Sequence, residues 1–231
     1  DDGGAIGCAL YISHTPHKDA LIPYSPYLGP SFSDTEVKGI LEQWDIEYEY
    51  ISDFSVLCKI VCGEIANGKV IGWFQERMEF GPRALGNRSI LADPRNPEMK
   101  DIINSKVKYR EAFRPFAPAA LEEYACMVFE MNDTSPYMAS TYQVKSNSIK
   151  LPAITHVDKT ARVQTVSRSL NEKFHALLSA FYELTGCPVL LNTSFNMMGE
   201  PIVCSPADAV NTFQNSGIDI LVMNNFIVRK I

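Results

Sequence analysis

The sequence predicts an α/β (α+β) fold, in which helices pack against a sheet, and three observations lead to this prediction. Segments with the apolar spacing of helices alternate along the chain with short apolar runs that are typical of strands. Helix-capping residues and glycines mark the ends of several of these segments. Apolar residues make up 46% of the 231 residues, which is enough for a sizeable core.

Helices are predicted where an apolar face coincides with a start or stop signal. Ser33 begins a capping box, and Asn96 precedes a proline at the first helical position. The predicted helices cover about residues 33–44, 55–67, 96–108, 121–130, 170–185 and 205–217. By helical spacing, we expect Trp44, Val56 and Leu184 to lie on buried faces.

Strands are predicted from short apolar or alternating runs. These runs cover residues 69–75, 161–167 and 187–191, and two more strands within 218–230 flank a turn at Asn224-Asn225. The strand at 187–191 is expected to lead into a polar loop. Residues 132–155 show no period that predicts either a helix or a strand.

The first thirty residues differ from the rest in composition. A Gly/Ala-rich start is followed by "LIPYSPYLGPSFS", which is typical of a linker. We therefore expect residues 1–30 to be the tail of a preceding domain with its linker, and residues 31–231 to form the next domain. Because the chain starts without methionine or a signal peptide, we expect it to be part of a longer protein.

Cysteine and histidine usage argues against disulfide and metal frameworks. The six cysteines form no CxxC pair, and Cys58 and Cys62 lie one helical turn apart in an apolar pattern. Reduced structural thiols predict a cytoplasmic protein. The four histidines show no spacing typical of zinc ligands, and no run of about 18 apolar residues predicts a membrane span.

Charge is distributed unevenly along the chain. The net charge of −6 argues against non-specific binding of nucleic acid. Residues 72–118, however, hold nine of the 21 Arg and Lys residues and only six of the 27 Asp and Glu residues. The cations are therefore concentrated in one region, as expected for a local binding site.

This basic stretch suggests an anion-binding cleft. Its main cations are Arg83, Arg88, Arg95, Lys106, Lys108, Arg110 and Arg114. Arg83 lies in "FGPRALG", where glycine and proline predict a constrained loop, and guanidinium groups suit phosphate or carboxylate. Prolines and phenylalanines around residues 113–118 argue against a solvated helix. The alternative is an ion-pair network with Glu76, Glu79 and Glu111.

Two further groups could contribute to a site. "LLNTSFN" supplies Asn192, Thr193, Ser194 and Asn196 where a buried strand ends, a common place for ligands in α/β proteins, although a helix cap or turn explains them as well. "HVDKTARVQTV" brings together His156, Asp158, Arg162 and Gln164. His156 could act as an acid or base, but a surface turn that leads into a strand explains the segment equally well. No P-loop and no GxGxxG motif is present.

Several longer strings together resemble one family. "RMEFGPRALGNRSILADPR", "VKYREAFRPFAP", "HVDKTARVQTV" and "LLNTSFNMMGEPIVCSPADA" resemble, in order over residues 70–230, the carboxyl-terminal part of the nodulation-type (NodU/CmcH family) O-carbamoyltransferases. The resemblance implies two domains: an amino-terminal domain of the actin-like ATPase superfamily, and a YrdC-like carboxyl-terminal domain with a twisted, open, mixed sheet and flanking helices.

The resemblance also implies two-step chemistry. The YrdC-like domain would form carbamoyl adenylate from carbamoyl phosphate and ATP with Mg²⁺. The carbamoyl group would then pass to a hydroxyl of a sugar or another small molecule on the amino-terminal domain, beside a metal ion expected to be iron. Positioning and charge stabilisation would be the protein's main contribution to the first step.

Matching motifs imply roles for individual residues. Arg83, Lys108 and Arg114 would be catalytic residues that bind the phosphates and the carbamoyl oxygens. The residues implied in nucleotide binding are Ser194, Asn196, Asn192, Arg88 and Arg110. The start of the chain resembles the last strand and turn of the amino-terminal domain, so Asp2 would be a metal ligand only in the longer protein.

Two other classes of function remain open from the sequence. One is a non-catalytic nucleotide- or RNA-binding module, although the net negative charge argues against RNA. The other is a structural domain whose arginines pair with carboxylates. The enzyme hypothesis predicts that Arg83, Lys108, Arg114, Ser194 and Asn196 converge on one pocket.

Overall fold

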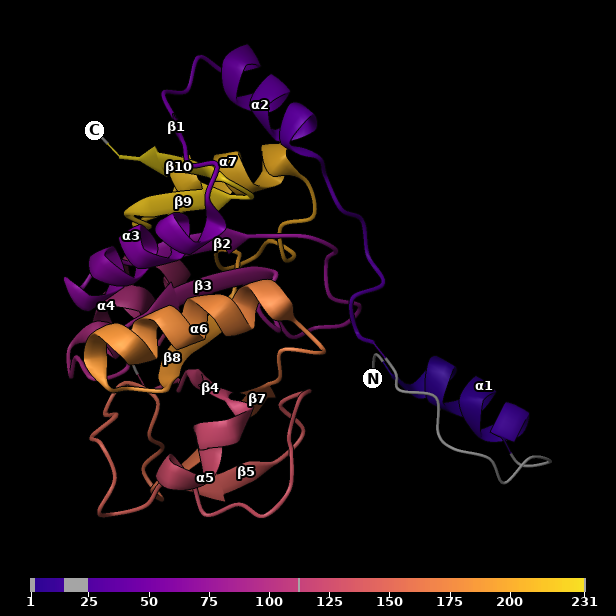
Figure 1. The fold of residues 1–231 in the computed structure, drawn as a ribbon, viewed down its shortest axis with the longest axis vertical. Coiled ribbons are helices and arrows are strands. Elements are labelled where there is room, and N and C mark those ends of the chain that lie inside the picture. Colours follow the sequence, from indigo (N-terminus) through magenta and orange to yellow (C-terminus); the bar gives the residue numbers. More distant parts are fainter. Residues whose placement is uncertain (1–2, 15–24, 112, 231) are drawn as a thin grey trace.

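An eight-stranded mixed sheet forms the centre of the computed structural model, which describes residues 3–14, 25–111 and 113–230 (Figure 1). The strand order is β1-β10-β9-β2-β3-β8-β4-β7. The strands are β1 (Glu49–Tyr50), β2 (Ile71–Phe74), β3 (Arg88–Ala92), β4 (Ala117–Leu121), β7 (Gln164–Val166), β8 (Val189–Ser194), β9 (Ile220–Met223) and β10 (Phe226–Arg229). β2 is parallel to β9 and β4 is parallel to β7, whereas the other neighbours are antiparallel.

Helices cover this sheet, and a small second sheet lies beyond one end of it. The helices are α1 (Gly4–His14), α2 (Asp34–Gln43), α3 (Phe54–Ala66), α4 (Met99–Ile103), α5 (Ala125–Val128), α6 (Glu172–Thr185) and α7 (Pro206–Gln214), with a π-helix at Asn104–Lys108 and a 3₁₀ helix at Glu122–Tyr124. α3 and α6 pack together on one face, while α7 contacts β2 and β9 (Figure 1). The second sheet pairs β5 (Thr141–Gln143) with β6 (Thr160–Arg162).

The structure confirms the predicted elements whose ends have clear chemical signals. The Ser33 side chain accepts a hydrogen bond from the Glu36 amide, and the Glu36 carboxylate accepts one from the Ser33 amide, as the capping box requires. α6 ends at Gly186, which has a φ of 69°, a left-handed conformation that glycine adopts without a steric penalty. β9 and β10 form the predicted hairpin around Asn224-Asn225.

Two predicted helices are wrong in part. The helix at 96–108 starts later, at Met99, because the Asn96 side chain accepts a hydrogen bond from the Glu98 amide in a turn that precedes the helix. It then widens into the π-helix Asn104–Lys108. The region 121–130 holds only two short helical turns, and the preceding segment is a strand, β4, paired on both sides. Sheet pairing therefore takes only Leu121 from the predicted helix.

Three side chains predicted to be buried are exposed. Val56 is 43% exposed because it lies beside the buried stripe of α3, Trp44 is 37% exposed because it caps the end of α2, and Leu184 is 57% exposed in the last turn of α6. The predicted strand at 161–167 is divided between β6 and β7, which belong to different sheets. Residues 192–194, predicted as a loop, continue strand β8.

The amino-terminal region also differs from its prediction. Residues 4–14 form helix α1, whereas the resemblance implied a strand and turn. Residues 26–30 run along residues 77–80, with hydrogen bonds from the Gly29 amide to the Met78 carbonyl (2.9 Å) and from the Met78 amide to the Pro30 carbonyl (2.9 Å). The Arg77 guanidinium donates to the carbonyls of Leu28 and Gly29. The end of the predicted linker is therefore attached to the loop that follows β2.

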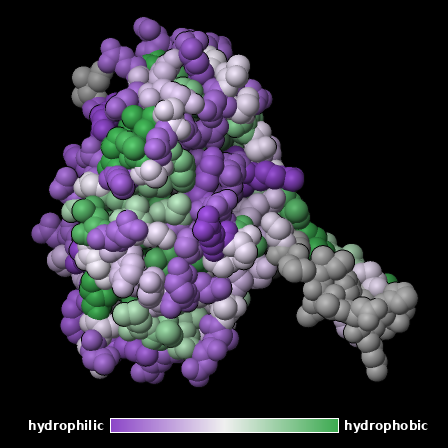
Figure 2. Space-filling view, viewed as in Figure 1, coloured by the Kyte–Doolittle hydropathy of each residue, from purple (hydrophilic) through white to green (hydrophobic). Residues whose placement is uncertain are grey.

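The surface shows no extended apolar face on the side drawn in Figure 2. Hydrophilic residues spread over the main body, and hydrophobic residues form small patches between them. Among the described residues, no helix has both the length and the apolar character needed to cross a membrane.

Candidate functional site

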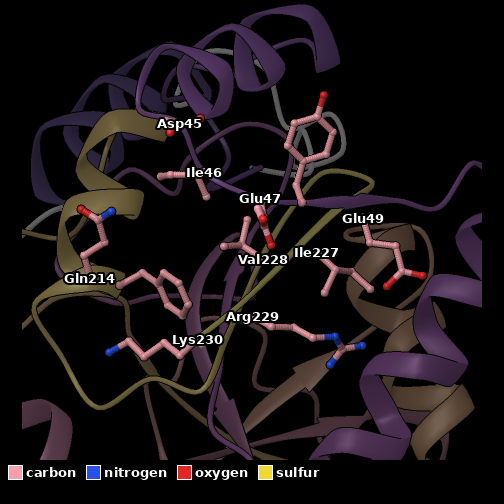
Figure 3. A pocket seen from close by; sticks show the side chains of 11 residues that line it. Asp45, Ile46, Glu47, Glu49, Gln214, Ile227, Val228, Arg229 and Lys230 are labelled. Carbon is pink, nitrogen blue, oxygen red and sulfur yellow. The ribbon is translucent and has the colours of Figure 1, made fainter.

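A broad cleft of about 630 Å³ lies between the segment after α2, strand β10 and the end of α7 (Figure 3). Its two cations already have partners within the fold. Lys230 donates to the Ser216 carbonyl, and Arg229 forms a 2.6 Å ion pair with Glu64. No residue assigned to a site from the sequence lines this cleft, so we place the candidate site elsewhere.

A second pocket of about 90 Å³ brings several predicted residues together. We call it the arginine pocket, and its lining residues are Pro82, Arg83, Ala84, Arg110, Pro115, Phe116, Ala117, Met138, Arg162, Asn192, Thr193 and Ser194. Arg83, Arg110 and Arg162 are its charged residues, and no carboxylate is among the lining residues. Such a pocket has an unbalanced positive charge and is suited to an anion.

Five separate segments build the arginine pocket, and one of them contributes only Met138. Arg83 lies in the loop between β2 and β3, and Arg110 follows the π-helix. Arg162 is the last residue of β6, and Asn192 and Ser194 belong to β8. The site therefore depends on the whole tertiary structure, because β6 and β8 belong to different sheets.

The arginines perturb one another. The pKa of Arg162 is lowered mainly by burial and, to a smaller extent, by the charge of Arg83. The pKa of Arg110 is lowered mainly by burial and, to a smaller extent, by the charge of Arg114. Within the described chain, no carboxylate forms an ion pair with Arg83, Arg110 or Arg162. A bound anion would relieve this repulsion.

Two buried polar atoms of the pocket residues have no hydrogen-bond partner in the described structure. One is Nε of Arg162, a donor, and the other is Oδ1 of Asn192, an acceptor. Unsatisfied buried groups are costly, so they are expected to find partners in a ligand or in water. A ligand with both anionic oxygens and an N–H group would satisfy both atoms.

Lys108 lies beside the arginine pocket and contacts two of the residues predicted with it. Its ammonium group donates to the backbone and side-chain oxygens of both Ser194 and Asn196, with 2.8 Å to Asn196 Oδ1 and 3.2 Å to Ser194 Oγ. Burial, followed by the charge of Arg110, lowers the pKa of Lys108 to about 7. The four oxygen acceptors act in the opposite direction, because they favour the charged form.

The structure thus brings Arg83, Lys108, Ser194 and Asn196 to one region but places Arg114 at its margin. Arg114 is exposed and does not line the arginine pocket, although its charge lowers the pKa of Arg110. Convergence of all five predicted residues on one pocket is therefore only partly observed.

Arg88, assigned a nucleotide-binding role by the resemblance, has a different environment. Its side chain is fully buried, lies over the Phe74 ring and donates to the carbonyls of Gln75, Asn87, Pro30 and Glu76. Burial lowers its pKa to about 10. These carbonyls occupy its two terminal nitrogens, while its buried Nε has no partner in the described structure. Arg88 does not line the arginine pocket, and its hydrogen bonds join β3 to the preceding loop.

Among the described residues, the ion-pair network considered from the sequence is not formed. Glu79 is buried and accepts hydrogen bonds from backbone amides, and Glu76 lies 3.9 Å from Lys173. Glu111 accepts a hydrogen bond from the Arg114 amide through its carbonyl. None of these carboxylates lines the arginine pocket, although the charge of Glu111 partly opposes the lowering of the Arg110 pKa.

Of the residues grouped around His156 in the sequence, His156 and Asp158 belong to a turn, whereas Arg162 and Gln164 lie at or near the arginine pocket. His156 and Asp158 both bond to Thr160, His156 through Nδ1 at 3.0 Å and Asp158 through Oδ1 at 2.7 Å. Arg162 lines the arginine pocket, and Gln164 accepts a hydrogen bond from Asn192 at 3.0 Å. The sequence placed Arg162 in this group without singling it out, and only its position at the end of β6 turns it toward the other arginines.

Metal binding has no support among the described residues. They contain no group of three or more His, Cys, Asp or Glu side chains that could hold a metal ion. Asp2, the predicted metal ligand, lies outside the residues that the structure describes.

These features define a class of protein: a mixed α/β domain with a positively charged pocket built by loop residues and the end of strand β8. The particular family follows from comparison with known proteins. Residues 62–230 match the model of the family described as "Carbamoyltransferase C-terminus", and the chain belongs to that family.

Curated relatives support this assignment over the whole chain. The chain is 46% identical to the nodulation protein NolO of Bradyrhizobium diazoefficiens, a match that covers 100% of this chain and 43% of NolO. It is 37% identical to the 3'-hydroxymethylcephem-O-carbamoyltransferase of Amycolatopsis lactamdurans, covering 97% of this chain and 41% of that protein. The chain corresponds to the C-terminal part of these relatives and spans less than half of their length.

A solved structure confirms the expected fold. Full-length HypF, in its phosphate- and nucleotide-bound form, matches 80% of this chain with a TM-score of 0.52 and 16% identity, and the match covers 23% of the HypF chain. The mixed sheet with flanking helices is therefore the YrdC-like fold that the sequence predicted.

Proposed function

We propose that this chain is the adenylate-forming part of an O-carbamoyltransferase. Its substrates would be carbamoyl phosphate and ATP with Mg²⁺, and its product carbamoyl adenylate. The observation that supports this proposal best is the arginine pocket, a small cavity that is lined by three arginines and by no carboxylate. Both proposed substrates are anionic.

The size and chemistry of the arginine pocket fit one small anion. Its volume of about 90 Å³ is well below the roughly 300 Å³ at the lower end for enclosed ligands, so it suits a phosphate-sized group rather than a whole nucleotide. The unpartnered Asn192 Oδ1 could accept from the NH₂ of a carbamoyl group, and Arg162 Nε could donate to an anionic oxygen. The nucleoside would then lie outside the pocket mouth.

The proposed step needs positioning and charge stabilisation. Water would release phosphate from carbamoyl phosphate, and the carbamate oxygen would attack the α-phosphorus of ATP and displace pyrophosphate. Negative charge develops on phosphoryl oxygens during both events, and fixed guanidinium donors stabilise such charge. The pocket lining offers no carboxylate ligand for Mg²⁺, so we expect the ion to be held by phosphate oxygens and water.

The second step would need more than this chain. The cephem enzyme's name specifies a hydroxymethyl acceptor, and by analogy we propose a hydroxyl-bearing small molecule or sugar as the acceptor here. We further propose that the acceptor and a metal ion, expected to be iron, are bound by an amino-terminal domain of the longer protein. That domain would be the main partner of this chain.

The direct test is to incubate the chain with ATP, Mg²⁺ and carbamoyl phosphate and to measure carbamoyl adenylate by mass spectrometry. Product is expected from the wild type, and a loss of about a hundredfold is expected in Arg83→Ala or Arg162→Ala. Arg168→Ala is the matched control, because Arg168 is exposed, pairs with Glu172 and does not line the pocket. Equal product from all variants would refute the proposal.

An alternative function is a nucleotide-binding module without chemistry. Saturable ATP binding that needs Arg83 and Arg162, without adenylate, would favour this alternative. RNA binding with a steep salt dependence would indicate a different use of the same charges.

A further inference from the structure

The loop that carries Arg83 folds around a buried carboxylate. Glu79 is 4% exposed, and its Oε1 accepts hydrogen bonds from three backbone amides: those of Leu85 (2.7 Å), Asn87 (2.7 Å) and Arg88 (3.2 Å). Three amides of one loop therefore converge on a single oxygen. Arg83 lies between Glu79 and these amides in the sequence, in the part of the loop that is exposed.

The opposite side of the same loop is attached to the arginine pocket. The Ala84 carbonyl accepts a hydrogen bond from Asn192 Nδ2 at 3.2 Å. The Leu85 carbonyl accepts two hydrogen bonds, from Gln164 Nε2 at 2.8 Å and from the Tyr27 hydroxyl at 2.9 Å. The backbone next to Arg83 is thus held on one side by Glu79 and on the other by groups at or behind the pocket.

Glycine permits this wrapping at two positions. Gly81 and Gly86 have φ values of 138° and 108°, which disfavour other residues. A Cβ on Gly86 would lie 2.2 Å from the Phe174 ring. The loop is therefore shaped so that its amides turn inward, toward Glu79.

We propose that Glu79 is a positioning residue, which fixes the backbone of the Arg83 loop so that the Arg83 guanidinium reaches an anion in the arginine pocket. This inference rests on the proposed function, because it assigns Glu79 a role at the same site. Glu79 does not line the pocket and would act through Arg83 alone. The fixed backbone keeps the guanidinium near its binding position before the anion arrives, which lowers the entropy lost on binding.

Charge explains why a carboxylate suits this position. A single oxygen that accepts three amide hydrogen bonds needs a high negative charge density. Burial raises the pKa of Glu79, whereas hydrogen bonds from the backbone amides of Asn87, Glu79 and Leu85 and the charge of Arg88 oppose that rise. Glu79→Gln keeps the shape and one acceptor oxygen, so it separates the loss of charge from the loss of the loop's support.

A double-mutant cycle with inorganic phosphate as the probe tests this role. Calorimetry would give the phosphate dissociation constants of the wild type, Glu79→Ala, Arg83→Ala and the double variant. Each single variant is expected to bind about tenfold more weakly, and the double variant no more weakly than Arg83→Ala. Effects that multiply in the double variant, or wild-type affinity in Glu79→Ala, would overturn the proposal.

Two further variants exclude a merely structural effect. Glu79→Gln is expected to recover part of the lost phosphate affinity, because its amide oxygen can still accept from the loop but carries less negative charge. Glu76→Gln is the matched control, since it removes the same charge from a more exposed carboxylate, 3.9 Å from Lys173. If Glu76→Gln weakens phosphate binding as much as Glu79→Ala does, a role specific to Glu79 is refuted.

Hydrogen exchange separates this inference from the proposed function. In the wild type, the amides of Leu85, Asn87 and Arg88 are expected to be protected, and Glu79→Ala is expected to remove that protection. Protection that persists in Glu79→Ala would refute the role of Glu79 even if phosphate binds. If these amides are protected in the wild type but the chain binds no phosphate, the anion site itself is refuted. The assignment of Glu79 to that site then fails as well.

Discussion

Lys108 and Asn196 are joined by two hydrogen bonds, because the lysine Nζ donates both to the Asn196 carbonyl (2.9 Å) and to its side-chain Oδ1 (2.8 Å). Ser194 Oγ also donates to that Oδ1, at 2.7 Å. Lys108 therefore fixes the backbone where β8 ends, at Ser194, which lines the arginine pocket. A buried cation beside three arginines should respond to pH and to anions.

The first prediction concerns the pH dependence of anion binding. Since burial lowers the pKa of Lys108 to about 7, the ammonium form prevails below that pH and the neutral amine above it. Sulfate, whose charge is constant in this range, is expected to bind more tightly at about pH 6 than at about pH 8.5. Calorimetric titrations at the two pH values would measure the difference.

Lys108→Gln is the control for this prediction. It keeps a hydrogen-bond donor but cannot change charge, so the difference in sulfate affinity between the two pH values should disappear. A difference that persists in Lys108→Gln would assign the pH dependence to another group.

The second prediction concerns Arg162. Arg162→Ala is expected to weaken phosphate binding about tenfold, because it removes one of the three guanidinium groups that line the arginine pocket. Arg162→Lys should recover part of the affinity, since it keeps the charge but loses the planar fork. Calorimetry with phosphate measures both, with Arg168→Ala at an exposed position as the reference. Phosphate affinity unchanged in Arg162→Ala would show that the anion lies elsewhere.

The sequence predicted well those elements whose ends have a local chemical cause. The capping box at Ser33 and the left-handed Gly186 depend only on neighbouring residues, so their signals are visible in the sequence. Strand β4 was missed because its pairing with β7 and β8 is set by distant residues. The π-helix that carries Lys108 has no distinct sequence signal, so a continuous α-helix was predicted there.

The same distinction applies to the site. Motifs identified Arg83, Lys108, Ser194 and Asn196, and the structure brings them to one region. Arg88 carries the same charge, but its position in the interior of the sheet directs both terminal guanidinium nitrogens to backbone carbonyls. Composition and spacing do not show which arginine faces a cavity, because that depends on strand register and on tertiary contacts.

The third prediction concerns the glycine that lets the Arg83 loop close. Gly86→Ala is expected to lower the free energy of unfolding by about 2–4 kcal/mol, because the new methyl group meets the Phe174 ring and the φ of 108° disfavours alanine. Urea denaturation would measure the change. Gly39→Ala in α2 is the matched control, since no atom lies within 4 Å of its Cβ position, and it should stabilise the helix by about 0.5–1 kcal/mol. Equal effects at the two positions would contradict the close packing of Gly86.

The fourth prediction concerns Asn192, whose side chain is almost fully buried. Its Nδ2 donates to the Ala84 carbonyl and to Gln164 Oε1. Asn192→Asp removes both donors and places a carboxylate against two acceptors, beside the arginine pocket. It is expected to lower the free energy of unfolding by about 2–4 kcal/mol at neutral pH and to abolish phosphate binding.

The sign of its pH dependence follows from burial. A carboxyl group in this position should have a raised pKa in the folded state. As the pH falls, it therefore binds a proton at a higher pH in the folded state than in the unfolded state. Stability lost at neutral pH should therefore be partly regained as the pH falls toward about 5, because the protonated group can again donate a hydrogen bond. Urea denaturation at the two pH values, with the exposed substitution Asn132→Asp as control, measures this recovery. If Asn192→Asp and Asn132→Asp respond alike to pH, the Asn192 amide is not the donor that joins the Arg83 loop to strand β8.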